Sequence, residues 1–123
     1  MSVLDTSAVL AIMYRETGAD VARKHLDAAS ISLVNVAEVL GHLMKSGRAD
    51  PAEGLGLVKE LKLRTRRVHE GHVKRVAELG SVKNLALGDR FCIALGESID
   101  EPLVTGDTAW ASLPLKVPVI LIR

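Results

Sequence analysis

The feature that most constrains the fold is a repeated alternation of short, β-branched apolar runs with longer segments of helical periodicity. Strands that alternate with helices are typical of βαβ units, in which neighbouring strands pair in parallel. The runs expected to form strands are residues 2–4, a segment near Ile31, another near Val68, residues 103–104 and residues 118–122. The alternation predicts an α/β fold with a central parallel sheet and helices on both faces, in one domain over residues 1–123.

The segments between these runs have the apolar spacing of helices. They cover residues 6–14, 18–28, 33–45, 51–63, 70–83 and 89–98, with a short helix around Trp110. Gly47 favours an end to the third helix, and Pro51 suits the first turn of the fourth. Ligands of parallel sheets bind at the carboxyl ends of the strands, so residues that follow a strand are the first candidates for a functional site.

Composition excludes several classes of protein. Sixteen Lys and Arg against fifteen Asp and Glu leave a net charge of +1, so the chain is not a generally basic nucleic-acid coat. Its three aromatic residues are too few for a platform on which bases stack. The longest uncharged stretch has ten residues, against about 20 for a membrane-spanning helix, and the single cysteine suits a reducing compartment. We therefore expect a cytoplasmic protein with no membrane segment.

Three aspartates lie where a predicted strand meets a predicted helix. Asp5 follows the first strand, Asp107 follows the fourth after a turn at Thr105 and Gly106, and Asp89 opens a helix. Each aspartate alone is explained by a helix N-cap, because its side chain accepts a hydrogen bond from a free backbone N–H there. Considered together, the three carboxylates are expected at the same edge of the sheet.

Glu38 differs from the aspartates because it lies well inside a predicted helix. Only Asn35, Glu38 and His42 interrupt the apolar residues of this segment, at spacings of three and four that put them on one stripe. A narrow solvated edge of the helix explains the stripe. A polar crevice facing the same edge explains it as well, and would bring Glu38 to the three aspartates.

The four acids Asp5, Glu38, Asp89 and Asp107 would repel one another if they met at this edge. Two carboxylates about 4 Å apart repel by about 4 kcal/mol at an effective dielectric constant near 20, so the cluster requires protonation or a cation. An all-oxygen pocket suits Mg²⁺ or Mn²⁺ rather than zinc. These ions neutralise charge on a phosphate substrate and help to generate a hydroxide nucleophile. The sequence therefore predicts a divalent-cation site that acts on phosphates.

Hydroxyl groups next to the acids are candidates for a supporting role. Ser7 lacks the G-x-S-x-G surroundings of a serine nucleophile, and we expect it to orient Asp5 or a metal-bound water. Thr6 and Thr105 are expected to support the acids in the same way. The pair His69 and His72 has a spacing of three, whereas the zinc-protease helix requires four, so we assign the pair no metal.

Basic residues gather between positions 59 and 75, where seven Lys and Arg accompany two Glu. A solvated surface explains this segment, but a patch that follows phosphates fits an otherwise neutral protein that binds RNA. The candidate RNA contacts are Lys59, Lys62, Arg64, Arg66 and Arg67.

Five runs in order, VLDTSAVLAI, ISLVNVAEVL, LGDRFCIALGE, PLVTGDTAW and VPVILIR, resemble the motifs of PIN-domain proteins. Within that family they are most similar to the VapC-type toxins of bacterial and archaeal toxin–antitoxin pairs. The resemblance implies a PIN-like fold and a Mg²⁺- or Mn²⁺-dependent ribonuclease. Its four acidic positions would be Asp5, Glu38, Asp89 and Asp107, with Thr6 and Ser7 matching the polar residues after the first acid.

The resemblance also implies partners. Members of the family commonly form homodimers and are inhibited by a cognate VapB-type antitoxin that inserts a basic residue into the acidic pocket. A positive mean hydropathy of +0.23 agrees with apolar surface covered by another subunit, and we expect it on the helices of residues 6–14 and 34–44. Phe91 departs from the family pattern, in which small residues are common. The alternative function is a non-catalytic PIN-like scaffold that binds RNA or a protein partner.

Overall fold

The strands of the molecule form one five-stranded sheet in the order β3-β2-β1-β4-β5, and every pair of neighbours is parallel. The computed structural model describes all residues from 1 to 123. The strands are β1 (Val3–Leu4), β2 (Ser30–Ser32), β3 (Arg64–Arg66), β4 (Leu103–Thr105) and β5 (Val119–Leu121). The chain moves outward from β1 in one direction and then returns to its other side with β4. Such a reversal creates a crevice at the carboxyl ends of the two strands.

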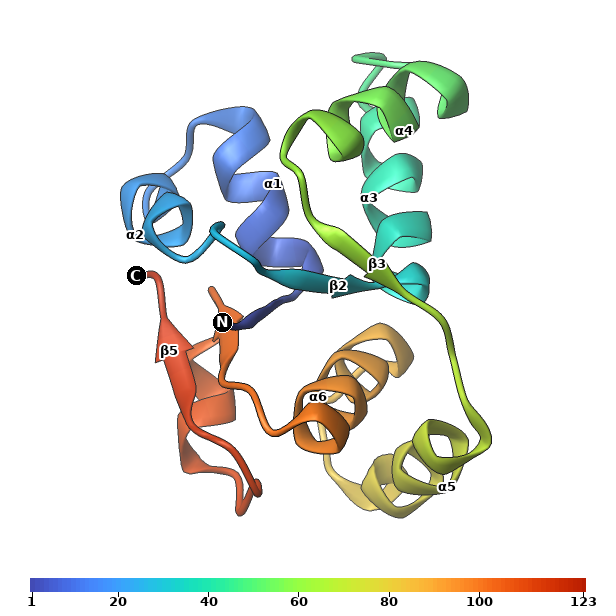
Figure 1. Cartoon of the computed structure of the whole chain (residues 1–123), viewed down its shortest axis with the longest axis vertical. Helices are drawn as coiled ribbons and strands as arrows, with labels where there is room; N and C mark the ends of the chain where they lie inside the picture. The colour runs from blue at the N-terminus through green and yellow to red at the C-terminus, as the bar shows by residue number, and fades with distance from the viewer.

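Six α-helices cover the two faces of the sheet, as the alternation predicts. They are α1 (Thr6–Tyr14), α2 (Ala19–Lys24), α3 (Leu33–Lys45), α4 (Pro51–Glu60), α5 (Glu70–Glu78) and α6 (Leu87–Ile99). Figure 1 shows α1 to α4 on one side of the sheet and α5 and α6 on the other. None of these helices is both long and apolar enough to cross a membrane.

The core is divided by the sheet because successive strand residues point to opposite faces. In β1, Val3 packs with Ile93 and Trp110 on the side of α6, whereas the next residue, Leu4, packs with Val39 on the side of α3. All five of these side chains are fully buried. Burying one such apolar side chain contributes about 1.5–3 kcal/mol, so both faces hold β1 at the centre of the molecule.

Two helices begin directly where a strand ends, which brings their first turns to the carboxyl edge of the sheet. The Oδ1 atom of Asp5, the N-cap of α1, accepts a hydrogen bond from the N–H of Ala8 at 2.8 Å. Ser32, the last residue of β2, caps α3 in the same way through the N–H of Val34 at 3.2 Å. These caps satisfy backbone groups that a helix end leaves free.

The third strand is not where the sequence predicts it. Val68 lies in an exposed connection, and the strand is Arg64–Arg66. A strand was expected in this part of the chain, but its position was wrong because β3 is an edge strand, which pairs only with β2 and leaves Arg64 and Thr65 exposed. Charged side chains are common on such edges, and they hide the apolar pattern by which a strand is recognised.

Several boundaries also differ from the prediction. The second helix, Ala19–Lys24, is shorter than residues 18–28, and both Gly18 and Ala28, which have a positive φ, lie outside it. The helices predicted for residues 51–63 and 70–83 end earlier, at Glu60 and Glu78. Two differences affect the site: α6 begins at Leu87, so Asp89 is its third residue, and Thr105 ends β4 rather than forming a turn.

Candidate active site

Asp5 is the most strongly held acid of the site, and it is buried. Its Oδ1 accepts a hydrogen bond from the hydroxyl of Ser7 at 2.7 Å in addition to the one from Ala8, and its Oδ2 accepts one from Thr105 at 2.5 Å. Burial raises the pKa of Asp5, and the charge of Asp107 adds to the rise, whereas the three donors lower it. They do so because hydrogen bonds donated to a carboxylate favour its ionised form.

The same two hydroxyls connect Asp5 to the chain that follows β4. Ser7 Oγ accepts a hydrogen bond from the N–H of Gly106 at 2.8 Å, and Thr105 Oγ1 accepts one from the N–H of Asp107 at 3.0 Å. This arrangement depends on the parallel pairing of β1 with β4, which aligns Leu4 with Val104. Pairing of the two strands therefore brings Asp5 and Asp107 to one side of the crevice.

Glu38 enters the crevice from α3. Its Oε1 accepts hydrogen bonds from the hydroxyl of Thr6 at 2.6 Å and from the side-chain amide of Asn35 at 2.8 Å. Thr6 is the first residue of α1, so these bonds join the start of α1 to the middle of the polar stripe predicted on α3. Asn35 and Glu38 thus face other parts of the protein, whereas His42, the third residue of the predicted stripe, is exposed to solvent.

Asp89 is half-buried in the first turn of α6, and its Oδ2 accepts a hydrogen bond from the N–H of Ala86 at 3.1 Å. Burial raises the pKa of Asp89 to about 6, and the charges of the other three acids contribute to the rise, while the N–H of Ala86 opposes it. The contributing acids are Asp5, Glu38 and Asp107. The structure therefore brings all four sequence-predicted acids within electrostatic range of one another.

Three of the acids share a pattern of hydrogen bonding. Glu38 and Asp89 each have one oxygen bonded to the chain, and Asp107 likewise accepts a bond from the N–H of Ala109 at 3.0 Å through Oδ1. Each leaves its second oxygen, Oε2, Oδ1 and Oδ2 respectively, without a donor from the protein. One oxygen fixes the carboxylate and the other is free for a ligand.

The donor set of the crevice fits a hard divalent cation. All the free atoms are carboxylate oxygens, which Mg²⁺ and Mn²⁺ prefer. No three His, Cys, Asp or Glu side chains lie close enough to bind one ion directly. An ion here would therefore have at most two of these carboxylates as direct ligands, and water would complete its coordination. Cys92 is buried one turn after Asp89, and burial raises the pKa of its thiol well above the ordinary value.

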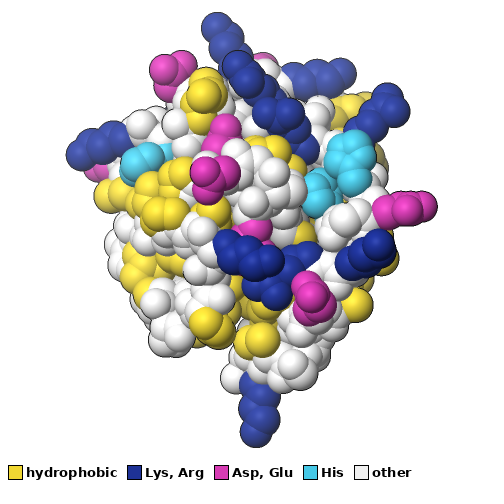
Figure 2. Space-filling view, turned by 60° about the horizontal axis from the view of Figure 1, so that its bottom comes forward, with side chains coloured by type: hydrophobic (Ala, Val, Ile, Leu, Met, Phe, Trp, Pro, Cys, Tyr) yellow, Lys and Arg dark blue, Asp and Glu magenta, His cyan; other side chains and the backbone are white.

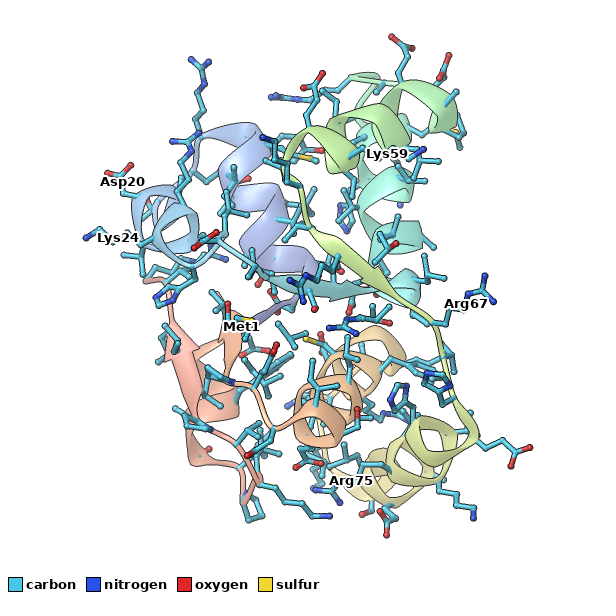
Figure 3. The ribbon with its side chains drawn as sticks, in the orientation of Figure 1. Met1, Asp20, Lys24, Lys59, Arg67 and Arg75 are labelled. Atoms are coloured by element: carbon cyan, nitrogen blue, oxygen red, sulfur yellow. The ribbon has the colours of Figure 1, made fainter.

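The candidate basic residues do not form one patch. Figure 3 places Lys59 on α4 and Arg67 beyond the carboxyl end of β3. Arg66 pairs in register with Ser32 at the start of α3, and its Nε donates to Ser30 Oγ at 3.0 Å. On the face shown in Figure 2, basic and acidic side chains are interspersed. Lys59, Lys62 and Arg64 belong to the amino side of β3, and Arg66 and Arg67 to the carboxyl side, where the acids lie.

The two histidines set aside in the sequence have a structural role in α5. Nδ1 of His72 accepts a hydrogen bond from the N–H of His69 at 3.3 Å, and its Nε2 lies 3.0 Å from the hydroxyl of Ser98. Sequence reasoning missed two residues of the candidate site. It placed Asn35 only on a stripe and gave Gly88 no role, although a glycine directly before Asp89 is a signal of close packing.

A model of the PIN domain matches residues 2–115 of the chain. The chain belongs to the PIN-domain family. The match covers all four acids, and the PIN-like fold implied by the sequence is confirmed. No curated protein sequence matches the chain.

Solved structures similar to this PIN domain include chains of toxin–antitoxin complexes. A toxin–antitoxin complex from Klebsiella pneumoniae has a chain with a TM-score of 0.76 and 17% identity, with 100% of this chain and 98% of that chain covered. A chain of VapBC2 from Rickettsia felis, bound to a promoter DNA fragment, has a TM-score of 0.74 and 14% identity, with 98% of this chain and 97% of that chain covered. A chain of VapBC-5 from Mycobacterium tuberculosis has a TM-score of 0.64 and 22% identity, with 99% of this chain and 97% of that chain covered. At these identities the likeness concerns the fold.

Proposed function

We propose that this PIN domain is a Mg²⁺- or Mn²⁺-dependent endoribonuclease and the toxin of a VapBC-type toxin–antitoxin pair, acting in the cytoplasm. The observation that carries the proposal is the meeting of four carboxylates, three of which keep one oxygen free of the protein. Nucleases of this kind require oxygen ligands around a phosphate, and the crevice supplies them at the switch point of the sheet.

The chain's own residues would position the reacting groups. Asp5 is fixed by Ser7, Ala8 and Thr105, so its carboxyl group keeps one orientation in the site. Asp5, Glu38, Asp89 and Asp107 would hold a divalent cation, directly or through water, the last three with the oxygens that no protein group donates to. When bound, this cation would supply charge neutralisation and activation of a water molecule. Attack by the oxygen of a water molecule would form a new bond to phosphorus and break the bond to the 3′ oxygen, which takes up a proton from the water. The products would therefore carry 5′-phosphate and 3′-hydroxyl ends.

RNA would be guided to the acids by positive charge at the carboxyl side of β3. We expect Arg67 to contribute more than Lys59 or Lys62, because Arg67 lies at the edge of the sheet that carries the acids. The Nε of Arg66 already donates a hydrogen bond to Ser30 Oγ, so less of its guanidinium group is free to contact a phosphate. Replacing a phosphate contact weakens binding and lowers its salt dependence without removing turnover at saturating RNA.

A VapB-type antitoxin is the proposed partner. Support comes from the structural likeness to chains of complexes described as toxin–antitoxin or VapBC assemblies. Each of these matches covers almost the whole of this chain. A basic residue inserted among the four carboxylates would replace the charge of the cation. The antitoxin would therefore block metal and substrate at once.

The direct test is cleavage of an end-labelled RNA by the wild-type protein with Mn²⁺ and by the Asp5→Asn and Asp89→Asn variants. We expect Mn²⁺-dependent cleavage by the wild type, at least a hundredfold less by each variant, and products with 5′-phosphate ends. Activity that survives excess EDTA, or products with cyclic phosphates, would falsify this mechanism.

A non-catalytic scaffold is the second candidate. It is favoured by the spacing of the acids, no three of which are close enough to hold an ion directly. A scaffold should bind RNA equally well with and without Mn²⁺ and should show no change in melting temperature when Mn²⁺ is added.

A further inference from the structure

A buried amide lies between α3 and α6, beside the acids but outside the set of residues proposed to hold the cation. Asn35 is 1% exposed. Its Nδ2 donates to Glu38 Oε1 at 2.8 Å and to the carbonyl of Gly88 at 3.1 Å, and lies 3.2 Å from the Oγ1 of Thr6. One side chain therefore connects the Glu38 carboxylate to the first turn of α6 and to the start of α1.

The buried amide of Asn35 lowers the stability of the fold. Asn35 Oδ1 is buried and has no hydrogen-bond partner, which destabilises a fold. Val39, which lies about one turn further along the buried face of α3, is apolar and carries no such penalty. What Asn35 adds over an apolar residue is its pair of N–H donors, and both face acceptors around Glu38.

Gly88 shows the same relation to Glu38 from the side of α6. A Cβ atom at this position would overlap both carboxylate oxygens of Glu38. The backbone of Gly88 has no positive φ, so its conformation does not require glycine. The missing side chain serves the close approach of the Glu38 carboxylate to the helix.

We propose that Asn35 and Gly88 are positioning residues that hold the Glu38 carboxylate in place for the divalent cation. This inference rests on the proposed metal-dependent function. Asn35 fixes Oε1 and leaves Oε2 free, while Gly88 provides the space in which the carboxylate lies against α6. Without either residue, Glu38 would move among several side-chain conformations, and an ion would have to restrict that motion on binding.

The first test compares two glycines in equivalent positions. Gly88 and Gly71 are each the second residue of a helix, and a Cβ at Gly71 would meet no atom within 4 Å. Mn²⁺ affinity is measured without RNA from the electron paramagnetic resonance signal of free Mn²⁺, on proteins shown to be folded by circular dichroism. We expect Gly88→Ala to bind Mn²⁺ about 10–100-fold more weakly than wild type, and Gly71→Ala to bind as wild type does.

The second test separates positioning from a loss of stability. Asn35→Ala should weaken Mn²⁺ binding about tenfold in the wild-type background and have no further effect in a Glu38→Gln background, because its action passes through Glu38. Ser2→Ala is the matched control, since Ser2 is also buried and donates one hydrogen bond, to the carbonyl of His25. It should lower the melting temperature and leave Mn²⁺ affinity unchanged.

The outcomes distinguish this inference from the proposed function. If the wild type binds Mn²⁺ and Asp5→Asn does not, the metal site stands. Wild-type Mn²⁺ affinity in Gly88→Ala and Asn35→Ala, or an equal loss from Asn35→Ala in both backgrounds, would then overturn the positioning role alone. A wild-type protein that binds no Mn²⁺ would overturn both.

Discussion

At the scale of single residues, the site combines acids that burial makes hard to ionise with donors that make ionisation easier. Asp5 has three donors against its burial, whereas Asp89 has one, from Ala86, and its pKa rises to about 6. The ordinary pKa of an aspartate is about 3.9. Ionised Asp89 therefore lowers the stability of the metal-free fold, and a cation would remove that penalty because it stabilises the charged form.

The pKa of Asp89 predicts how stability depends on pH in EDTA. Because the pKa of Asp89 is higher in the folded protein, its contribution to stability is complete below about pH 4 and is lost as the pH rises through about 6. The melting temperature of wild type relative to Asp89→Asn should therefore fall between pH 4 and pH 7. Saturating Mn²⁺ at pH 7 should restore it. A difference that stays constant across this range would contradict the raised pKa.

At the scale of elements, the site depends on segments far apart in sequence that meet at the edge of the sheet. The end of β5 packs against the turn before α2, where Gly18 has a φ of +96° and a Cβ would lie 2.7 Å from the carbonyl oxygen of Ile122. A side chain at Gly18 would be strained by its backbone and would press on the C-terminal strand. Gly56 in α4 is the opposite case, with open space around its Cβ position.

We expect Gly18→Ala to lower the free energy of unfolding by about 1–3 kcal/mol, and Gly56→Ala to raise it by about 0.5–1 kcal/mol through helix propensity. Urea denaturation followed by circular dichroism measures both changes. If Gly18→Ala were as stable as wild type, this would contradict the close contact between the turn and the C-terminal strand.

The positions of the acids could be predicted because they follow from local rules. Asp5 and Asp107 come after strands, and the carboxyl ends of parallel strands share one edge. The strand Arg64–Arg66 could not be recognised, because its charged side chains carry no apolar pattern. The contact of Asn35 with Gly88 joins residues 53 positions apart, and no spacing within one helix reveals it.

At the scale of the whole molecule, apolar surface remains on α3 and α6 after folding. Leu33 and Met44 at the two ends of α3 are 44% and 58% exposed, and Leu87 at the start of α6 is 55% exposed. The sequence predicts that α1 and α3 contact a second subunit. The large side chains of α1 are buried or half-buried, so α3 has the more exposed apolar surface of the two. Leu33 and Leu87 begin the two helices that carry Glu38 and Asp89.

Light scattering tests whether this surface is covered by a second copy. We expect a mass of about twice 13.2 kDa at micromolar concentration, and a shift towards 13.2 kDa when Met44→Glu places a charge on α3. Lys45→Glu is the control, because it introduces a carboxylate at the neighbouring exposed position and changes the net charge even more than Met44→Glu does, without removing an apolar side chain. A monomeric wild-type protein would count against the dimer.

In the proposed function, four acids from distant segments form one divalent-cation site. Paramagnetic broadening of amide resonances by substoichiometric Mn²⁺ tests it in a single experiment on ¹⁵N-labelled protein. We expect broadening to be confined to the segments that carry the acids and to be greatly reduced by Asp5→Asn. These segments are residues 5–8, 35–38, 86–90 and 105–109. Broadening centred elsewhere, for example at His69 and His72, or unchanged in Asp5→Asn, would contradict the claim.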